Sequence, residues 1–145
     1  MTTEKKYSCA LGILLIIFCF RVGAQFVQFV SPVAFLPPFD DWQTGALSYE
    51  VLAVSQVIII FVLLRFVFRM ADGREIPDRK AGQVYLIFGC AYFGIMFFRI
   101  LAGLTFADGH SWHGAIIPAL FHLVLASFLI LLGRFHFRYG GDSVK

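Results

Sequence analysis

Two arginines lie inside segments that are otherwise apolar. Arg21 stands in the sequence CFRVGAQFVQF and Arg99 in MFFRILAGLTF, so each has hydrophobic neighbours on both sides. A charge at the bilayer centre costs between about 2.5 and 17 kcal/mol, so such residues pair with other groups or line a functional cavity. The forked guanidinium binds the oxygens of carboxylate and phosphate groups in a defined orientation. We therefore expect the two arginines to mark a site for an anionic or carbonyl-bearing molecule.

Further polar residues occur in the apolar segments. Arg21, Gln25 and Gln28 are spaced at i, i+4 and i+7, which places them on one face of a helix. The other segments carry polar residues at comparable depths or at their outer ends. We expect these side chains to converge on one cavity, with Thr105 near its mouth. The predicted ligand-binding residues are Arg21, Gln25, Gln28, Tyr49, Glu50, Gln56, Arg99 and His122.

The elements that position these residues are long apolar segments. Hydrophobic residues make up 59% of the chain, charged residues make up 14%, and the mean hydropathy is +0.81, which excludes an ordinary soluble domain. A helix needs about 20 mostly apolar residues to cross a bilayer. The sequence therefore predicts an all-α membrane protein, a four-transmembrane-helix bundle formed by a single domain of residues 1–145. The predicted spans are Ser8–Val30, Tyr49–Phe68, Val84–Phe106 and Ile116–Phe135.

The distribution of Lys and Arg predicts the orientation of the bundle. These residues precede the first span, surround the 69–83 connection and follow the fourth span, whereas Ser31–Ser48 and Ala107–Ala115 contain none. The positive-inside rule therefore puts both termini and the 69–83 loop in the cytoplasm. The net charge of +3 reflects this asymmetry and does not indicate nucleic-acid binding. We interpret the charges as a solvated basic rim, since no charge run is long enough for a dedicated anionic-lipid clamp.

The first 24 residues have a second interpretation as a cleaved secretory signal. They combine a basic start, the apolar stretch Leu11–Phe20 and a small-residue pattern, Val22-Gly23-Ala24. However, Arg21 immediately precedes that pattern, and apolar character continues through Gln25–Val30. These features favour a retained first helix, whereas cleavage would leave three helices in the same orientation.

Similar landmarks follow one another in both halves of the chain. Leu63–Arg69 (LLRFVFR) resembles Leu132–Arg138 (LGRFHFR), and each half also has a Phe-Arg pair followed by an outer loop with Trp. This order predicts two repeated helical hairpins in a parallel repeat, as in some transporters. The alternative is that the similarity between the two halves arose by chance, because both consist of a few apolar residue types.

The histidines suggest a haem site that the sequence does not complete. His122 and His136 fall on nearly one helix face, as haem ligands do in cytochrome b, but the other three spans contain no histidine. Haem therefore requires ligands from a homodimer partner and is disfavoured, and the interpretation of His136 as an interfacial residue is simpler. His110 and His113 have no evident further metal ligands. The three cysteines form no CxxC pair, and no nucleophile elbow, P-loop or dinucleotide fingerprint indicates an enzyme.

Four of these residues carry a family resemblance. Arg21 followed by Gly23 and Phe26, with Glu50 opening the second span, resembles the DoxX-like proteins. The resemblance covers about the first half of the chain. It implies a small four-helix protein of the bacterial inner membrane, linked in some members to quinone-associated redox complexes, with Arg21 and Glu50 as site positions. The chain departs from that pattern because Arg21 lies deeper, its glycine is closer, and a later basic residue is missing.

The sequence thus predicts a protein that binds an amphipathic or anionic ligand, such as a lipid or quinone, as an accessory component of a membrane complex. Glu50 is the only carboxylate in a predicted span, so the two arginines exceed internal neutralisation unless an outer-loop aspartate folds inward. This imbalance favours a ligand site. The alternatives are a structural subunit whose arginines pair with Glu50 and serve assembly, or a small transporter protomer. A homodimer is compatible with each of them.

Overall fold

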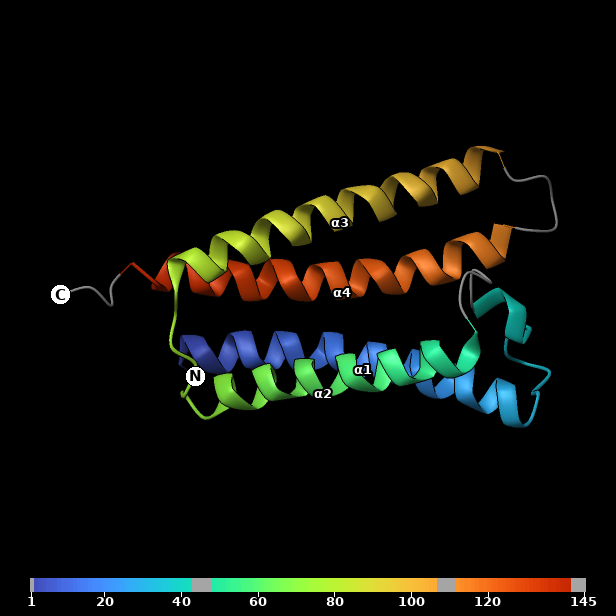
Figure 1. Cartoon of the computed structure of the whole chain (residues 1–145), viewed down its shortest axis with the longest axis horizontal. Coiled ribbons are helices and arrows are strands. Elements are labelled where there is room, and N and C mark those ends of the chain that lie inside the picture. Colours follow the sequence, from blue (N-terminus) through green and yellow to red (C-terminus); the bar gives the residue numbers. More distant parts are fainter. Residues whose placement is uncertain (1, 43–47, 107–111, 142–145) are drawn as a thin grey trace.

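The computed structural model of the chain describes residues 2–42, 48–106 and 112–141. Four long helices run roughly antiparallel in one bundle (Figure 1). They are α1 (Thr3–Val30), α2 (Tyr49–Ala71), α3 (Arg79–Phe106) and α4 (Trp112–Tyr139). A short 3-10 helix, η1 (Phe39–Trp42), lies between α1 and α2. The predicted all-α four-helix bundle is confirmed.

All four helices are long and apolar enough to cross a membrane, so the chain is a multi-pass membrane protein. All four extend past the predicted spans at the ends that carry basic residues: α1 begins at Thr3, α2 ends at Ala71, α3 begins at Arg79 and α4 ends at Tyr139. The predicted boundaries marked where the apolar residues stop. Backbone hydrogen bonding continues into the polar flanks, which leaves only residues 72–78 to connect α2 and α3.

The two ends of the bundle are built differently. We call the end that holds the start of α1, the end of α4 and the 72–78 connection the terminal end, and the opposite end the distal end (Figure 1). At the terminal end, α2 stops in a Schellman motif around Gly73, whose φ is 65°. Arg74 N–H donates to the Arg69 carbonyl at 2.8 Å, and Gly73 N–H donates to the Met70 carbonyl at 3.3 Å. This turn directs the chain back toward α3.

Polar contacts tie the 72–78 connection to the helices. Arg69 Nε donates to Glu75 Oε2 at 2.7 Å, and Glu75 Oε1 lies 3.5 Å from His136 Nε2 on α4. Asp78 N–H donates to His136 Nδ1 at 3.1 Å, so a neutral His136 carries its proton on Nε2, facing Glu75. We call these four residues the Glu75 latch. His136 is therefore buried beneath the connection near the end of α4, and its interpretation as an interfacial residue stays a prediction.

The core of the bundle lies mainly in its terminal half, where α1, α2 and α4 meet. Tyr7 packs edge-on against Phe135, with 5.4 Å between the ring centroids. Ser8 Oγ donates to the Val67 carbonyl at 3.1 Å, which joins α1 to α2. The buried core residues are Leu11, Leu15, Leu63, Met70, Phe128, Leu132 and Phe135.

Glycines bring α3 and α4 into backbone contact in the same half. A Cβ added to Gly133 would lie 2.8 Å from the Leu86 nitrogen, and one added to Gly89 would lie 2.9 Å from Ile130 Cγ1. Gly133 shares one face of α4 with Ala119 and Ala126, which are also buried, so this face of small residues packs inside the bundle.

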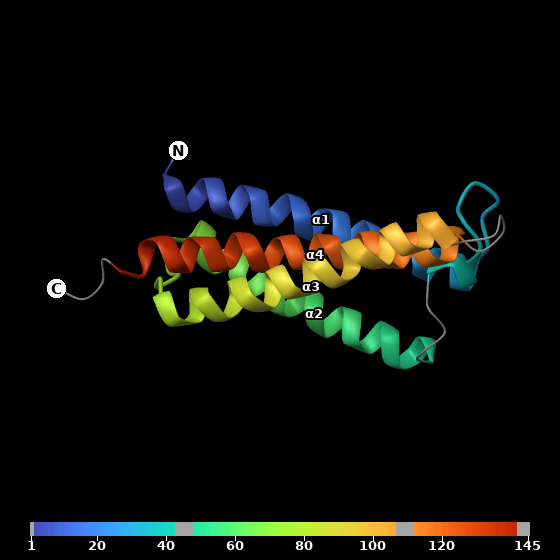
Figure 2. The same ribbon diagram turned by 90° about the horizontal axis from the view of Figure 1, so that it is seen from above.

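The distal half is more open. A Cβ added to Gly94 would meet nothing within 4 Å, and α3 and α4 diverge beyond this level (Figure 1). Figure 2 shows α2 also turning away from the other helices toward the distal end. The bundle is therefore closely packed at the terminal end and spreads apart at the distal end, where most of the predicted site residues lie.

Candidate functional site

Arg21 lies in the distal half of α1, and its exposed fraction is 6%. Its guanidinium carbon is 5.8 Å from the centre of the Phe121 ring on α4. Arg21 also interacts electrostatically with Tyr49 at the start of α2 and with His122 on α4. This arginine is therefore buried where α1, α2 and α4 approach one another.

Two glutamines form a buried pair beside Arg21. Gln56 Nε2 on α2 donates to Gln25 Oε1 on α1 at 3.3 Å, and the exposed fractions are 4% and 0%. The Gln25 amide nitrogen is also buried, but it has no hydrogen-bond acceptor within the described part of the chain. A buried donor without an acceptor costs about 1–3 kcal/mol. Gln25 therefore offers an unused donor one helical turn from Arg21.

Gln28 is buried on the predicted face of α1 but has a local role. Its Oε1 accepts a hydrogen bond from Val33 N–H at 3.0 Å. Because Val33 lies just beyond the end of α1, this contact stabilises the turn of the chain after the helix. The structure therefore uses the Gln28 side-chain oxygen for folding rather than leaving it open to a ligand.

His122 on α4 connects the site to α3. The Tyr92 hydroxyl is hydrogen-bonded to His122 Nδ1, and the two ring centroids are 5.7 Å apart. Arg99, two turns further along α3, also interacts electrostatically with His122, but it is exposed. The two arginines that the sequence matched therefore have different surroundings, and the predicted repeat stays a prediction.

Tyr92 was not among the predicted site residues. The i, i+7 spacing of Tyr92 and Arg99 on α3 is a signal that could have found it, because residues at that spacing share a helix face.

The distal ends of α2 and α3 bring one predicted residue toward the site and leave two outside. Tyr49 lies in an aromatic cluster, 4.4 Å from Phe29 and 5.1 Å from Phe39 between ring centroids. Glu50 is exposed, because adjacent residues on a helix point about 100° apart. Thr105 is exposed as well, and its hydroxyl donates to a carbonyl of its own helix at 3.0 Å.

The site that remains consists of residues from all four helices. The sequence left open whether an aspartate from an outer loop folds inward to neutralise the arginines. Asp40 is exposed and does not do so. Asp108 and the Asp41 side chain lie outside the described part of the structure. We call the following set the distal polar site: Arg21, Gln25, Gln56, Tyr92 and His122, with Tyr49 at its rim and Arg99 on its outer side.

Replacing Tyr92 with phenylalanine is expected to lower the free energy of unfolding by about 1 kcal/mol, because His122 loses a partly buried hydrogen bond. Thermal unfolding of the purified protein in detergent micelles measures this change. Tyr7→Phe, which removes a hydroxyl from the terminal half, is the control. An unchanged unfolding temperature for Tyr92→Phe would show that the bond contributes nothing to stability.

The site offers donors rather than metal ligands. Within the described residues, no group of three His, Cys, Asp or Glu side chains is placed to hold a metal ion. His136 Nδ1 accepts a hydrogen bond from Asp78 N–H, and His136 Nε2 faces Glu75. Both ring nitrogens therefore face the 72–78 connection and not a haem. The free cysteines Cys9 and Cys90 are exposed on the outer faces of α1 and α3.

Comparisons of the chain with protein-family models, with curated proteins and with solved structures found no match.

Proposed function

We propose that this membrane protein binds an amphipathic ligand, a lipid or a quinone, whose anionic or carbonyl head group occupies the distal polar site. The observation that carries the proposal is the Gln25 amide nitrogen, which is buried without an acceptor among the described residues. Arg21 lies one turn away on the same face of α1 and is also buried. A head group with two acceptor oxygens would bind both residues.

The hydrogen-bonding chemistry of the site supports a ligand rich in acceptors. Gln56 already uses its amide nitrogen as a donor to the Gln25 oxygen, which leaves the Gln25 amide nitrogen as a donor for a ligand. Arg21 and Arg99 carry donors only. A carboxylate or phosphate would bind an arginine through two parallel bonds, and a quinone carbonyl would accept from Gln25.

The surroundings of the site support an amphipathic ligand over a water-soluble one. The distal half of α3 exposes large apolar side chains, including Phe98 and Leu101, on either side of Arg99. A ligand that approaches through the bilayer would keep its alkyl tail against these residues while its head group reaches the donors. α3 and α4 diverge at this level, whereas glycines hold their backbones in contact in the terminal half (Figure 1).

The proposal includes a location and an orientation. The terminal end would face the cytoplasm of a bacterial inner membrane, because basic residues gather there. The distal polar site would then lie in the outer half of the bilayer, and the resemblance to DoxX-like proteins suggests a quinone-associated complex as the setting. The basic residues at the terminal end are Lys5, Lys6, Arg65, Arg69, Arg74, Arg79, Lys80, Arg134 and Arg138.

Arg21→Gln is expected to reduce ligand occupancy about tenfold or more, since a hydrogen bond to a charged group contributes about 1.5–3 kcal/mol. Native mass spectrometry of the protein in lipid nanodiscs measures the co-purifying ligand, and titration with decylubiquinone and with oleate tests each class directly. Arg65→Gln is the matched control, because it removes an exposed arginine from the terminal half of α2. Equal occupancy in both variants would contradict the proposal.

One observation favours a structural subunit as the second candidate function. Arg21 contacts Phe121 on α4 and is buried beside the Gln25–Gln56 hydrogen bond between α1 and α2, so it packs where three helices meet without any ligand. In that case Arg21→Gln would lower the unfolding temperature, and the wild-type protein would bind neither decylubiquinone nor oleate.

A further inference from the structure

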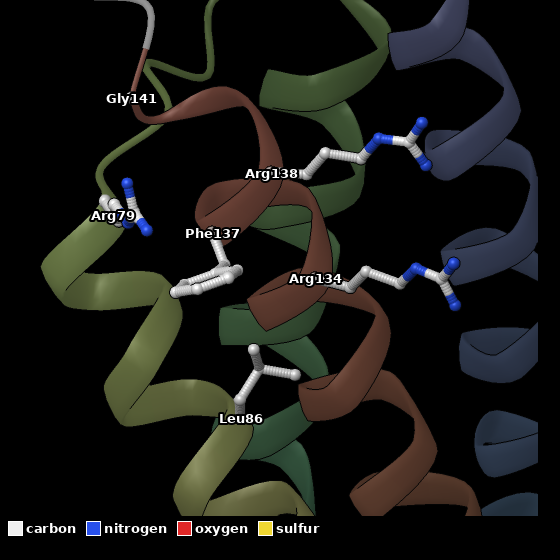
Figure 3. Close-up of a pocket in the computed structure, with 6 residues that line it drawn as sticks. All are labelled: Arg79, Leu86, Arg134, Phe137, Arg138 and Gly141. Carbon is white, nitrogen blue, oxygen red and sulfur yellow. The ribbon is translucent and has the colours of Figure 1, made fainter.

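A second group of cations lies at the terminal end, on α3 and α4. Arg79 is the first residue of α3, and Arg134 and Arg138 lie in the last turns of α4. The three arginines line a cleft of about 540 Å³ (Figure 3). The remaining lining residues are Leu86, Phe137 and Gly141.

The arginines are arranged around α4 in a defined way. Figure 3 shows Arg79 on one side of α4 and Arg134 and Arg138 extending side by side on the other. The Arg79 guanidinium carbon lies 4.9 Å from the centre of the Phe137 ring, which fixes this side chain at the cleft wall. Arg134 and Arg138 are one helical turn apart, and like charges at that spacing repel. An anion held between them would remove that repulsion.

The charges of the cleft are not neutralised by nearby carboxylates. In residues 2–42, 48–106 and 112–141, the ion pairs involve Arg69, Arg74 and His136, and none involves the three cleft arginines. Asp78, the neighbour of Arg79 in sequence, instead accepts a hydrogen bond from Lys80 N–H at 2.8 Å. Three cations therefore flank the cleft, Arg79 on one side of α4 and Arg134 and Arg138 on the other (Figure 3).

The helix packing fixes the shape of the cleft. Gly133 brings α4 against the Leu86 backbone, and Gly82 brings α3 against the Phe137 backbone, so both apolar lining residues sit at points of closest helix contact. The helix backbones that form the cleft are therefore in direct contact with each other.

We infer that this cleft binds the phosphate head group of an acidic phospholipid. Arginine forks match phosphate oxygens, and basic pockets between transmembrane helices suit anionic head groups. The cleft lies at the terminal ends of α3 and α4, which would meet the head-group region, and its apolar lining residues Leu86 and Phe137 lie beside Arg79, where the first acyl carbons would pack (Figure 3). The sequence showed only a basic rim, because Arg79 and the two α4 arginines lie far apart along the chain. This site is independent of the distal polar site.

Native mass spectrometry of the detergent-solubilised protein tests the inference, with phosphatidylglycerol and phosphatidylcholine of identical acyl chains as the two probes. The wild-type protein is expected to retain phosphatidylglycerol at least tenfold more strongly. The Arg134→Gln/Arg138→Gln variant is expected to lose that preference. Arg65→Gln/Arg74→Gln is the control, because it removes the same charge from the same end of the bundle but outside the cleft.

The outcomes separate the alternatives. Equal retention of the two lipids by the wild type, or equal loss of preference in both double variants, would overturn the inference. Displacement of phosphatidylglycerol by excess inorganic phosphate would show that the cleft takes free phosphate and would overturn the lipid assignment. If the Arg134→Gln/Arg138→Gln variant does not fold, Arg79→Gln provides the test, with a smaller expected loss of about threefold or more, and an unchanged lipid preference would count against the site.

Discussion

Replacing Gly82 with leucine is expected to lower the free energy of unfolding by about 3 kcal/mol, the largest loss for a single substitution at the interface of α3 and α4. A Cβ at Gly82 would lie 2.8 Å from the carbonyl carbon of His136 and closer still to the Phe137 nitrogen. Both atoms belong to the backbone, so no side-chain rotation can make room. The two helices would have to separate along their closest contact.

Gly94→Leu on the same helix is the matched control. A Cβ at Gly94 would meet nothing within 4 Å, so this substitution should leave stability unchanged or raise it by up to about 1 kcal/mol through helix propensity. Denaturation with sodium dodecyl sulfate, followed by circular dichroism, measures both variants. If Gly82→Leu and Gly94→Leu unfold at the same denaturant concentration, the close backbone contact does not exist in the membrane protein.

Glu75→Ala is expected to destabilise the protein by about 1–2 kcal/mol. The Glu75 carboxylate accepts a hydrogen bond from Arg69 Nε at 2.7 Å and lies 3.5 Å from the buried His136 Nε2, so its loss releases the 72–78 connection. The Arg69 side chain is 41% exposed, and water screens its part of the interaction, which keeps the expected loss small.

Asp72→Ala provides the comparison for Glu75→Ala. Asp72 lies 3.9 Å from Arg74 in a pair that is exposed on both sides, and such a pair contributes little. Hydrogen exchange of the 72–78 backbone should accelerate in Glu75→Ala and stay unchanged in Asp72→Ala. Equal exchange in the two variants would show that the Glu75 latch does not hold the connection.

The sequence predicted the parts of this structure that depend on one helix alone. Segment length and hydropathy identified all four helices, and the i, i+4, i+7 spacing predicted that Arg21, Gln25 and Gln28 share a buried face. These features follow from helix geometry and from the thickness of the bilayer.

The features that the sequence could not predict depend on how two helices meet. Arg21 and Arg99 have similar neighbours in sequence, yet α3 packs mainly against α4, so much of its surface, including Arg99, stays exposed. The Tyr92–His122 bond and the cleft of three arginines both require a particular register between α3 and α4. Glycine contacts at Gly82 and Gly133 set that register, and no spacing rule within one helix reveals it.

The divergence of α3 and α4 has a mechanical consequence. α3 and α4 are in close contact at Gly89 and separate beyond it, so a small rotation of α3 about this contact would move its distal end. At a rise of 1.5 Å per residue, a tilt of about 5° there moves the tip of α3 by roughly 2 Å. The Tyr92–His122 hydrogen bond joins α3 to α4 between the Gly89 contact and Arg99, so it would oppose this rotation. The separation of the distal parts of α3 and α4 therefore depends on the Tyr92–His122 hydrogen bond and on the glycine contacts beneath it.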